Sequence, residues 1–408
     1  MPGRSLSIGV SNMSNLSKLR GDWSAPFAPA LNAAYAKFAS EVHQGIPSAL
    51  TRAGVFNFFD WTDSLFQQDW ALVSAGEHLS KDTKAILNMK APPIAALMLQ
   101  NRDRSKTKLI CDSGGFQIQE GTWKFKSYST GEREAICKMI FQWQQLVGDF
   151  ALPLDIPTGC YMKKSVAGKA GYNSFEDCLA GTLENLAWFF GFPKIIKHDL
   201  KLLNVLQGDT EEERITWFDA VKAFRSDGWA LSYRAFGKST EAVARMLRML
   251  RLEEKLGHHL HILGTCATDA ALEFSILQNI IRQHYEHNYT ITFDASTPFT
   301  ESMRGKILQV SNREVVETIW LPQNLPENLP FPLVNSPVSR LITSDDMRGN
   351  GTWTEIGHGL ATSHNLYTYL EHYIQQNNQL QYALHHASAC SFKTNYMQRE
   401  RILSNILI

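Results

Sequence analysis

Residues 108–117 read Lys-Leu-Ile-Cys-Asp-Ser-Gly-Gly-Phe-Gln, and the architecture of the chain can be worked out from this segment outward. A short apolar run ends at Asp112. Gly114 and Gly115 then let the backbone turn close to a ligand, because no Cβ obstructs the approach. The glycines also permit two plainer interpretations, a loop that cradles phosphate or a simple turn between strand and helix. No Gly-Lys-Ser/Thr follows and the chain has no GxGxxG, so neither common phosphate-binding signature is present.

Short apolar runs alternate with longer segments of helical periodicity over most of the sequence, which is the pattern of a parallel sheet flanked by helices. The predicted strands are residues 108–111, 150–154, 202–206, 229–231, 260–263 and 290–293. The predicted helices are residues 132–147, 175–190, 211–225, 240–256 and 269–285. Ser239 and Thr268 begin the last two helices and are expected to be their N-caps.

Each predicted strand is followed by a residue that can bind or react and that contributes little to packing. These residues are Asp112, Asp155, Gln207, Ser232, Gly264 and Asp294. Such groups at the ends of many strands indicate an α/β fold of the (β/α)8 TIM-barrel type, because those ends converge on one mouth. A doubly wound open sheet would gather them near one switch point instead. The two strands that complete the barrel are expected in the first hundred residues, around 54–58 and 94–97.

Composition narrows the class of protein. The 408 residues are 44% hydrophobic and 20% charged, which supports a large core and excludes intrinsic disorder. Forty basic and forty acidic residues leave no global positive field, so a polyanion would have to meet a local patch. Six scattered cysteines without a CxxC favour reduced thiols over a disulfide framework. With neither an apolar signal segment nor a span of about 20 apolar residues, we expect a cytoplasmic protein without membrane contact.

The composition changes after residue 320. Residues 321–338 contain five prolines, which excludes a helix or a central strand and predicts an extended connector. Helical periodicity resumes at residues 365–378. We therefore expect a catalytic barrel with an N-terminal extension over residues 1–320, a connector over 321–338, and a helical segment over 339–408 that packs on the barrel.

Three aspartates follow predicted strands, namely Asp112, Asp155 and Asp294. A single aspartate at such a position is more often a helix cap or a turn former than a catalyst. Three aspartates at one end of a barrel favour a catalytic role. Two carboxylates flanking a sugar carbon can carry out glycosyl transfer with retention, one as nucleophile and the other as proton carrier. A third could recognise the base.

The segment Asp-Ser-Gly-Gly-Phe-Gln at 112–117 resembles the signature of the tRNA-guanine transglycosylase family, whose members are zinc-containing (β/α)8 barrels that exchange guanine in a polynucleotide for a 7-deazaguanine base. Residues 205–208 are similar to the VQG turn of that family, and residues 263–264 to its MGVG strand. Residues 293–298 are similar to its FD…P segment, and residues 361–370 to its NTIHNLHYYL. The resemblance is colinear over roughly residues 90–380.

This resemblance implies a role for each matching residue. Asp294 would be the nucleophile that attacks C1′ of the sugar, and Asp112 would be the general acid/base. Phe116 would stack on the base. The other residues implied in the base pocket are Asp155, Gln207, Gly208, Ser113, Ser232 and Tyr233. The implied reaction is ping-pong and needs no cofactor.

The chain departs from the family pattern in the base pocket, in the segment that grips tRNA and in the zinc ligands. Residues 232–235 read Ser-Tyr-Arg-Ala in place of Gly-Gly-Leu-Ala, so the base pocket must be reshaped. Residues 299–304 replace the arginine-bearing stretch that helps to grip the anticodon loop. The CxCxxC zinc ligands are absent, so we expect no metal and interpret His364 as a packing or helix-start residue.

Other histidines offer only weak alternatives as metal ligands. A substitute zinc site would match no standard ligand spacing, because its ligands would be His372, His385, His386 and Cys390. His258, His259 and His261 are expected to flank a strand.

The loss of both tRNA-associated features makes the chain most similar to the DNA-guanine transglycosylases of phages and bacterial DNA-modification clusters. The implied partners are DNA, a free base such as 7-cyano-7-deazaguanine, and accessory DNA-modification proteins. Such an enzyme reads an extruded or single-stranded base while basic groups hold the phosphates. The candidate basic groups, which could equally be solvated loop charges, are Lys163, Lys164, Lys169, Arg304 and Lys306. A tRNA-acting enzyme and a noncatalytic nucleic-acid-binding subunit are the alternatives.

Overall fold

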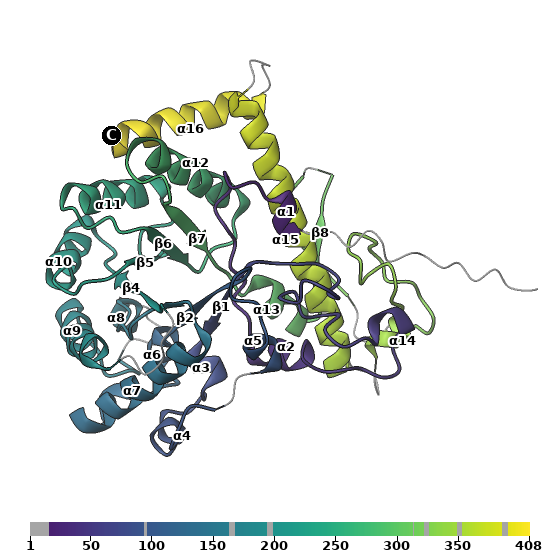
Figure 1. Cartoon of the computed structure of the whole chain (residues 1–408), viewed down its shortest axis with the longest axis horizontal. Helices are drawn as coiled ribbons and strands as arrows, with labels where there is room; N and C mark the ends of the chain where they lie inside the picture. The colour runs from purple at the N-terminus through teal and green to yellow at the C-terminus, as the bar shows by residue number, and fades with distance from the viewer. Residues whose placement is uncertain are drawn as a thin grey trace, which may run out of the picture.

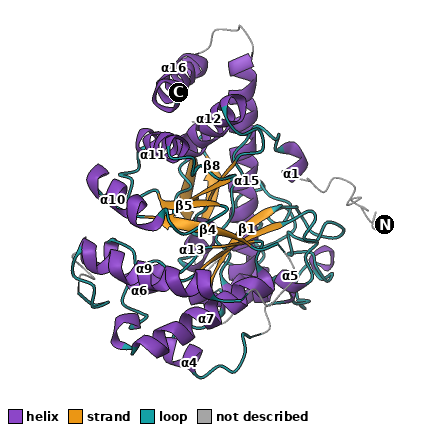
Figure 2. Ribbon diagram, turned by 60° about the vertical axis from the view of Figure 1, so that its left-hand side comes forward, coloured by secondary structure: helices purple, strands orange, loops and turns teal. Residues whose placement is uncertain are grey.

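The structure is a computed structural model that describes residues 16–93, 96–162, 168–193, 199–312, 314–321, 326–348, 353–385 and 391–408. Seven parallel strands form one curled sheet in the order in which they occur along the chain (Figure 1). They are β1 (Trp70–Ser74), β2 (Lys108–Asp112), β3 (Phe150–Ala151), β4 (Lys201–Leu206), β5 (Gly228–Ser232), β6 (His259–Leu263) and β7 (Thr290–Phe293). Figure 2 shows helices surrounding these strands.

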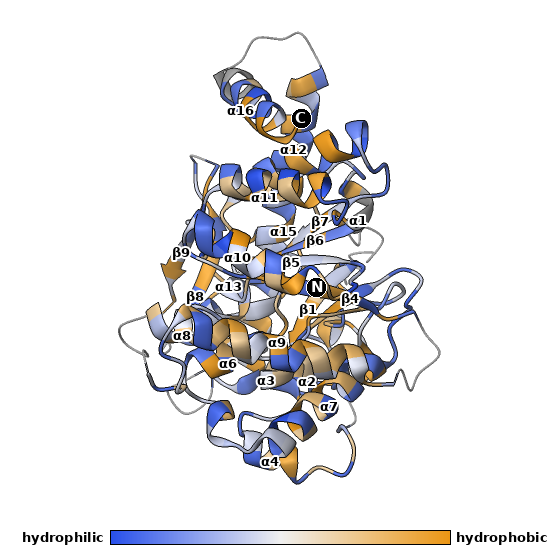
Figure 3. Cartoon of the chain, turned by 90° about the vertical axis from the view of Figure 1, so that its left-hand side faces the viewer, coloured by the Kyte–Doolittle hydropathy of each residue, from blue (hydrophilic) through white to orange (hydrophobic). Residues whose placement is uncertain are grey.

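Helices connect successive strands and cover the outer face of the sheet. Before β3 lie α1 (Leu16–Leu19), α2 (Ala33–Phe38), α3 (Ala75–His78), α4 (Thr83–Leu87), α5 (Leu97–Gln100), α6 (Gly115–Gln119) and α7 (Thr130–Val147). After β3 come α8 (Gly159–Met162), α9 (Phe175–Gly191), α10 (Glu211–Val221), α11 (Thr240–Leu252), α12 (Thr268–His284) and α13 (Thr297–Met303). Figure 3 shows polar and apolar residues mixed along α4, α7 and α11, as expected for helices between a sheet and solvent.

The strands are apolar on both faces because each face is covered. Leu109 and Cys111 pack outward into the main core, whereas Ile110 faces the inside of the curl. The inner cluster is formed by Ala28, Leu72, Ile110, Phe150, Leu152, Leu203, Val205 and Ala230. At the amino end of the strands, the ring of Phe150 lies 5.6 Å from that of Trp70 and 4.5 Å from that of His259. These rings fill the interior there, so a site within the curl has to lie at the carboxyl edge.

Residues 26–31 link the two edges of the sheet. Phe27 forms a parallel bridge with Phe293 of β7, and Ala30 forms one with Leu72 of β1. The backbone N–H of Ala28 donates to the carbonyl of Phe293 at 2.7 Å, and that of Leu31 donates to the carbonyl of Leu72 at 2.8 Å. The segment therefore satisfies backbone groups that would otherwise be left open on β1 and β7.

The predictions for the central strands and their helices are confirmed, whereas those for the first hundred residues are wrong. Residues 54–58 form turns, and Gly54 has a left-handed φ of 78°. Residues 94–95 lie outside the described part, and helix α5 begins at Leu97. The strand that was missed is β1 (Trp70–Ser74).

Two smaller corrections concern β3 and α12. Strand β3 ends at Ala151 rather than at residue 154, because a proline follows at 153 and cannot donate to a ladder. Thr268 is the first residue of α12 and not its N-cap, which is Ala267. Ser239 does cap α11, since its side chain accepts from the N–H of Ala242.

The carboxyl-terminal part adds a hairpin and helices. Strands β8 (Lys306–Val310) and β9 (Val316–Trp320) are antiparallel, and α14 (Ser344–Met347) follows the proline-rich segment. The long helix α15 (Glu355–His385) runs beside β8 and α13, and α16 (Ser391–Leu407) packs on α11 and α12 (Figures 1 and 2). No helix in the described ranges has the length and apolarity to cross a bilayer.

Candidate active site at the carboxyl edge of the sheet

Three carboxylates lie at the carboxyl edge of the curled sheet. Asp112 is the last residue of β2, Asp294 directly follows β7, and Asp155 lies just beyond β3. Burial is the main reason that the pKa of Asp112 is raised, and the negative charge of Asp294 raises it further. The charge of Asp112 in turn adds to the larger effect of burial on the pKa of Asp155. The three groups therefore form one electrostatic cluster, as expected from their positions after parallel strands.

Asp112 is held by a hydroxyl and a backbone amide. The Ser74 hydroxyl donates to its Oδ2 at 2.6 Å, and the N–H of Gly114 donates to the same atom at 3.2 Å. Gly114 has a φ of 99°, and a Cβ there would lie 2.7 Å from the ring of Trp123. Only glycine fits this turn without strain, which explains the first glycine of the sequence motif.

Asp155 and Gln207 form a buried pair. The side-chain amide of Gln207 donates to Oδ2 of Asp155 at 2.7 Å. The other oxygen, Oδ1, would lie 2.9 Å from a Cβ on Gly115, so the second glycine of the motif lets this loop approach the carboxyl group. Burial raises the pKa of Asp155 to about 7, although the hydrogen bond from Gln207 opposes the change. Asp155 is therefore expected to exchange a proton near neutral pH.

Asp294 is positioned by groups of β6. The N–H of Gly264 donates to its Oδ1 at 3.0 Å, and Nε2 of His261 lies 3.3 Å from the same oxygen. Nδ1 of His261 lies 2.9 Å from the hydroxyl oxygen of Thr292, which also contacts Nε2 of His259 at 2.8 Å. His261 thus hydrogen-bonds to Thr292 in the interior of the sheet, and its Nε2 approaches Asp294 without a hydrogen bond to any described residue.

The sequence analysis missed His261 as a site residue. His259 and His261 lie within β6 and do not flank it. Side chains alternate between the two faces of a strand, and His261 pairs with Thr292, two residues before Asp294. That register was the available signal, because it places the imidazole on the same face as the carboxylate of the neighbouring strand.

The other residues implied in base binding differ in exposure, since Phe116 is exposed whereas Ser113 and Tyr233 are buried. Phe116 is 60% exposed at the start of α6 and is available to a ligand. Ser113 is buried and donates to the carbonyl of Pro153, so its hydroxyl is already engaged. Tyr233 packs edge-on against Phe274, with its hydroxyl 3.3 Å from that of Thr240.

Gly208 and Ser232 occupy turns. Gly208 has a φ of 120°, and a Cβ there would lie 2.6 Å from the backbone nitrogen of Arg214. The residue therefore permits the turn into α10. The hydroxyl of Ser232 accepts from the N–H of Ala235 at 3.5 Å, within the turn after β5.

The candidate basic residues differ in their surroundings. Lys163 and Lys164 lie outside the described residues, and Lys169 is exposed. Arg304 and Lys306 contact the carboxylate of Glu301 at 2.7 and 3.2 Å. Glu301 therefore compensates much of the charge that was expected to be available for phosphate.

His364 is a packing residue that lies within α15, more than two turns after its start. His364 is fully buried, with Nδ1 2.9 Å from the Ser336 hydroxyl and Nε2 2.9 Å from the Leu308 carbonyl. Burial lowers its pKa to about 4. His386 and Cys390 lie outside the described residues. Among the residues that the structure does describe, no group of three or more His, Cys, Asp or Glu side chains could hold a metal ion.

Fold and site together define an α/β protein with a curled parallel sheet whose carboxyl edge carries three interacting carboxylates, a buried glutamine and an exposed phenylalanine. Neither a scan of family models nor a search of curated proteins gave a match for this chain.

Proposed function

We propose that this protein is a base-exchanging transglycosylase that replaces guanine in DNA with a 7-deazaguanine base through a covalent glycosyl-aspartate intermediate. The observation that carries the proposal is the carboxylate cluster, in which the charge of Asp294 acts on Asp112 and that of Asp112 acts on Asp155. Similarity of the sequence motifs to the tRNA-guanine transglycosylase family supports the assignment of roles.

The proposed architecture is a (β/α)8-type barrel. The sequential order of the seven parallel strands supports it, and residues 26–31 would supply the eighth strand between β7 and β1. The segment forms only isolated bridges, with Pro26 and Pro29 among its six residues. Because proline has no N–H, it cannot form a regular ladder on both sides.

In the first half of the reaction, Asp294 attacks C1′ of the target nucleoside. The C1′–N9 bond breaks, a C1′–O bond to Asp294 forms, and the proton of Asp112 passes to the departing guanine. In the second half, the incoming base gives its proton to Asp112 and attacks C1′, which releases Asp294 with net retention. The raised pKa of Asp112 suits this role, because burial favours the protonated form that a general acid has to supply.

Base recognition is assigned to Asp155, Gln207 and Phe116. A carboxylate can accept hydrogen bonds from the N1–H and N2–H groups of guanine, and an amide can donate to its O6. Phe116 supplies an exposed ring on which an extruded base can stack. The Asp155–Gln207 pair is preformed, so a purine would meet these two recognition groups already in place.

The decisive experiment is to trap the intermediate. The protein is incubated with a guanine-containing DNA oligonucleotide, and the covalent adduct is mapped by mass spectrometry. We expect attachment at Asp294, no adduct with Asp294→Ala, and incorporation of labelled guanine reduced at least about 10³-fold in Asp112→Ala.

The exposed carboxylate of Asp219, on α10, provides the matched control, and Asp219→Asn should retain exchange. Full exchange by the Asp112→Ala/Asp294→Ala double variant would reject the proposal. A parallel assay with an RNA anticodon stem-loop identifies the polymer, since a tRNA-acting enzyme would prefer the RNA.

A further inference from the structure

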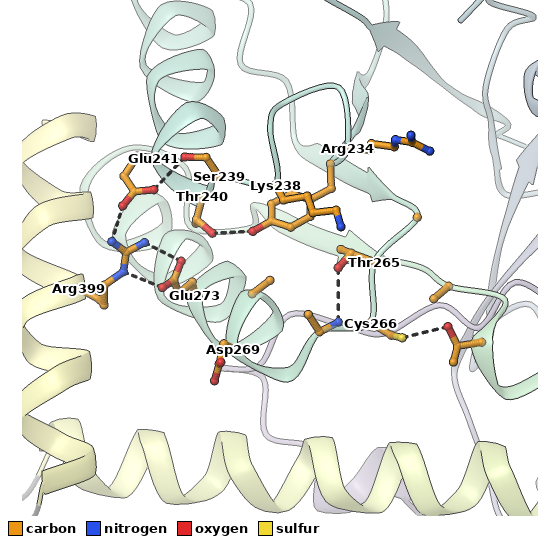
Figure 4. Close-up of a pocket in the computed structure, with 16 residues that line it drawn as sticks. Arg234, Lys238, Ser239, Thr240, Glu241, Thr265, Cys266, Asp269, Glu273 and Arg399 are labelled. Atoms are coloured by element: carbon orange, nitrogen blue, oxygen red, sulfur yellow. Dashed lines mark hydrogen bonds and ion pairs between the residues drawn. The ribbon is translucent and has the colours of Figure 1, made fainter. Parts of the chain in front are cut away.

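A cavity of about 560 Å³ opens at the carboxyl ends of β5, β6 and β7 (Figure 4). Two of its lining residues adjoin Asp294, since Gly264 donates to the Asp294 carboxylate and Ala295 follows it in the chain. Its lining comes from the loops after β5, β6 and β7, including Arg234, Gly264 and Ala295, and from Arg399 of α16. Asp112 instead ends β2, and Asp155 and Gln207 follow β3 and β4. Asp294 is therefore flanked by the base-recognition residues in one direction around the sheet and by this cavity in the other.

The acidic residues of the cavity are all engaged by neighbouring donors. The guanidinium of Arg399 pairs with Glu273 through two contacts of 2.6 and 2.9 Å, and it also contacts Glu241. The hydroxyl of Tyr396 donates to Asp269 at 3.1 Å. Arg399 thus engages two carboxylates with a single positive charge, as Figure 4 shows for Glu241 and Glu273, and a neutral hydroxyl engages Asp269.

Two further cations of the cavity lie outside these ion pairs, although the charge of Arg234 acts on the more distant Asp209. Arg234 and Lys238 are exposed, and neither forms an ion pair with a carboxylate in the described part of the chain. Both belong to one short loop, because the N–H of Lys238 donates back to the carbonyl of Tyr233 at 2.9 Å. Buried Tyr233 anchors this loop beside the turn that carries Gly264.

The backbone of the loop is itself unusual. Lys238 has a φ of 54°, a left-handed conformation that costs a non-glycine residue about 1–2 kcal/mol. Gly237 before it is also left-handed, with a φ of 65°. The chain therefore keeps a lysine at the cavity where a glycine or asparagine would be less strained.

We propose that this cavity binds a phosphodiester next to the target nucleotide, with Arg234 and Lys238 as the counter-ions. This inference rests on the proposed function, since it places the target sugar at Asp294. A sugar in a polynucleotide carries its base on C1′ and its phosphates on C3′ and C5′. When the base lies toward Asp155 and Gln207, the backbone has to leave in another direction, and the cavity with the exposed cations Arg234 and Lys238 lies there.

Affinity for DNA as a function of salt is the first test. The double variant Arg234→Ala/Lys238→Ala is compared with Arg225→Ala/Lys255→Ala, which removes the same charge from exposed positions at the amino edge of the sheet. Fluorescence anisotropy with a single-stranded guanine-containing oligonucleotide gives Kd over a series of salt concentrations. We expect the slope of log Kd against log salt to fall by about one to two in the first variant and to stay unchanged in the second.

A second test locates the phosphate. Oligonucleotides with one neutral methylphosphonate immediately 5′ or 3′ of the target guanosine are titrated with the unchanged protein and with Arg234→Ala/Lys238→Ala. At one of the two positions the substitution should weaken binding about tenfold in the unchanged protein and have little further effect in the variant. Equal weakening in both proteins at both positions would overturn the inference, as would absence of any oligonucleotide binding at low salt. Loss of base exchange with these binding effects intact would count against the proposed function alone.

Discussion

Folding raises the pKa of Asp155, so the free energy of unfolding depends on pH through this carboxyl group. Its pKa in the folded chain is about 7, whereas an unperturbed aspartate titrates near 4. The folded protein therefore binds this proton more tightly than the unfolded chain does. The resulting stabilisation is fully present below about pH 4 and is lost as the pH rises through about 7.

Replacing Asp155 with asparagine should remove this pH dependence while keeping an acceptor for Gln207. We expect Asp155→Asn to be more stable than the parent at pH 8, by on the order of 2 kcal/mol, and similar to it at pH 4. Urea unfolding at pH 4, 6 and 8 measures the difference. A stability difference that is the same at all three pH values would contradict the assigned environment of Asp155.

His261 is expected to position Asp294, the proposed nucleophile, because its Nε2 lies 3.3 Å from Oδ1 of that carboxylate. His261→Phe should lower kcat about 10- to 100-fold and change the KM for DNA less than about twofold. His261→Gln retains an N–H donor and should recover part of kcat. His258→Ala, at an exposed position before the same strand, is the control. A change confined to KM would exclude the positioning role.

Gly114 is required by the turn that holds Asp112. Gly114→Ala would force a side chain into a left-handed conformation and against the ring of Trp123, so we expect a loss of about 2–4 kcal/mol in the free energy of unfolding. Gly131→Ala is the matched control, because a Cβ at this helical position meets no atom within 4 Å. That variant should be neutral or up to about 1 kcal/mol more stable.

At the scale of elements, the docking of α16 depends on Arg399. The guanidinium holds the pKa of Glu241 down at about 2, and the hydrogen bond between the two groups is the main cause. The pair therefore stabilises the docked helix above the unfolded glutamate pKa of about 4.3, and this contribution is lost as the pH falls toward 2.

Arg399→Ala should weaken the contact of α16 with α11 and α12 without unfolding the sheet. We expect hydrogen exchange within Ser391–Leu407 to accelerate about 5- to 30-fold, as for a loss of about 1–2 kcal/mol. Arg401→Ala, on the same helix but exposed, should leave the exchange rates unchanged. Equal rates in the two variants would show that the ion pairs contribute nothing to docking.

For the whole molecule, Phe27 connects the segment 26–31 with both the sheet and the long helix. Its ring lies 5.3 Å from that of Phe293 and 4.6 Å from that of Tyr369. Phe27→Ala should lower the free energy of unfolding by about 3–5 kcal/mol and preserve a single cooperative transition. Phe116→Ala removes an exposed ring of the same type and should change stability by less than about 0.5 kcal/mol.

The sequence allowed the central strands and the three aspartates to be located, because continuous apolar runs followed by acidic residues are local patterns. The segment 26–31 gave no such signal, since its prolines and alanines lack the composition of a strand. Strand β1 was missed because it lies among irregular, aromatic-rich residues. Helix α15 was predicted too short, as its first turns bury glycine and serine, and a Cβ on Gly359 would lie 2.5 Å from the ring of Phe38.

The site could be predicted only in part, because its geometry depends on contacts between loops that are distant in the sequence. Which residue follows a strand can be inferred from the chain alone, but how neighbouring loops meet depends on tertiary packing. The pairing of Arg304 and Lys306 with Glu301 and the engagement of Ser113 with Pro153 are of this kind. The cavity bounded by Arg399 also depends on a helix far along the chain, and no spacing in the sequence indicates that contact.

The bridge between Phe27 and Phe293 has a consequence for how the molecule is made. These two residues are separated by most of the chain. Residues 26–31 are synthesised early, and they can pair on both sides only after β7 has left the ribosome. Until then residues 26–31 present an open backbone edge, which is prone to association with other nascent polypeptides. Closure over so long a loop is also slow. We therefore expect newly synthesised chains to depend on chaperones until residues 26–31 have paired with β7.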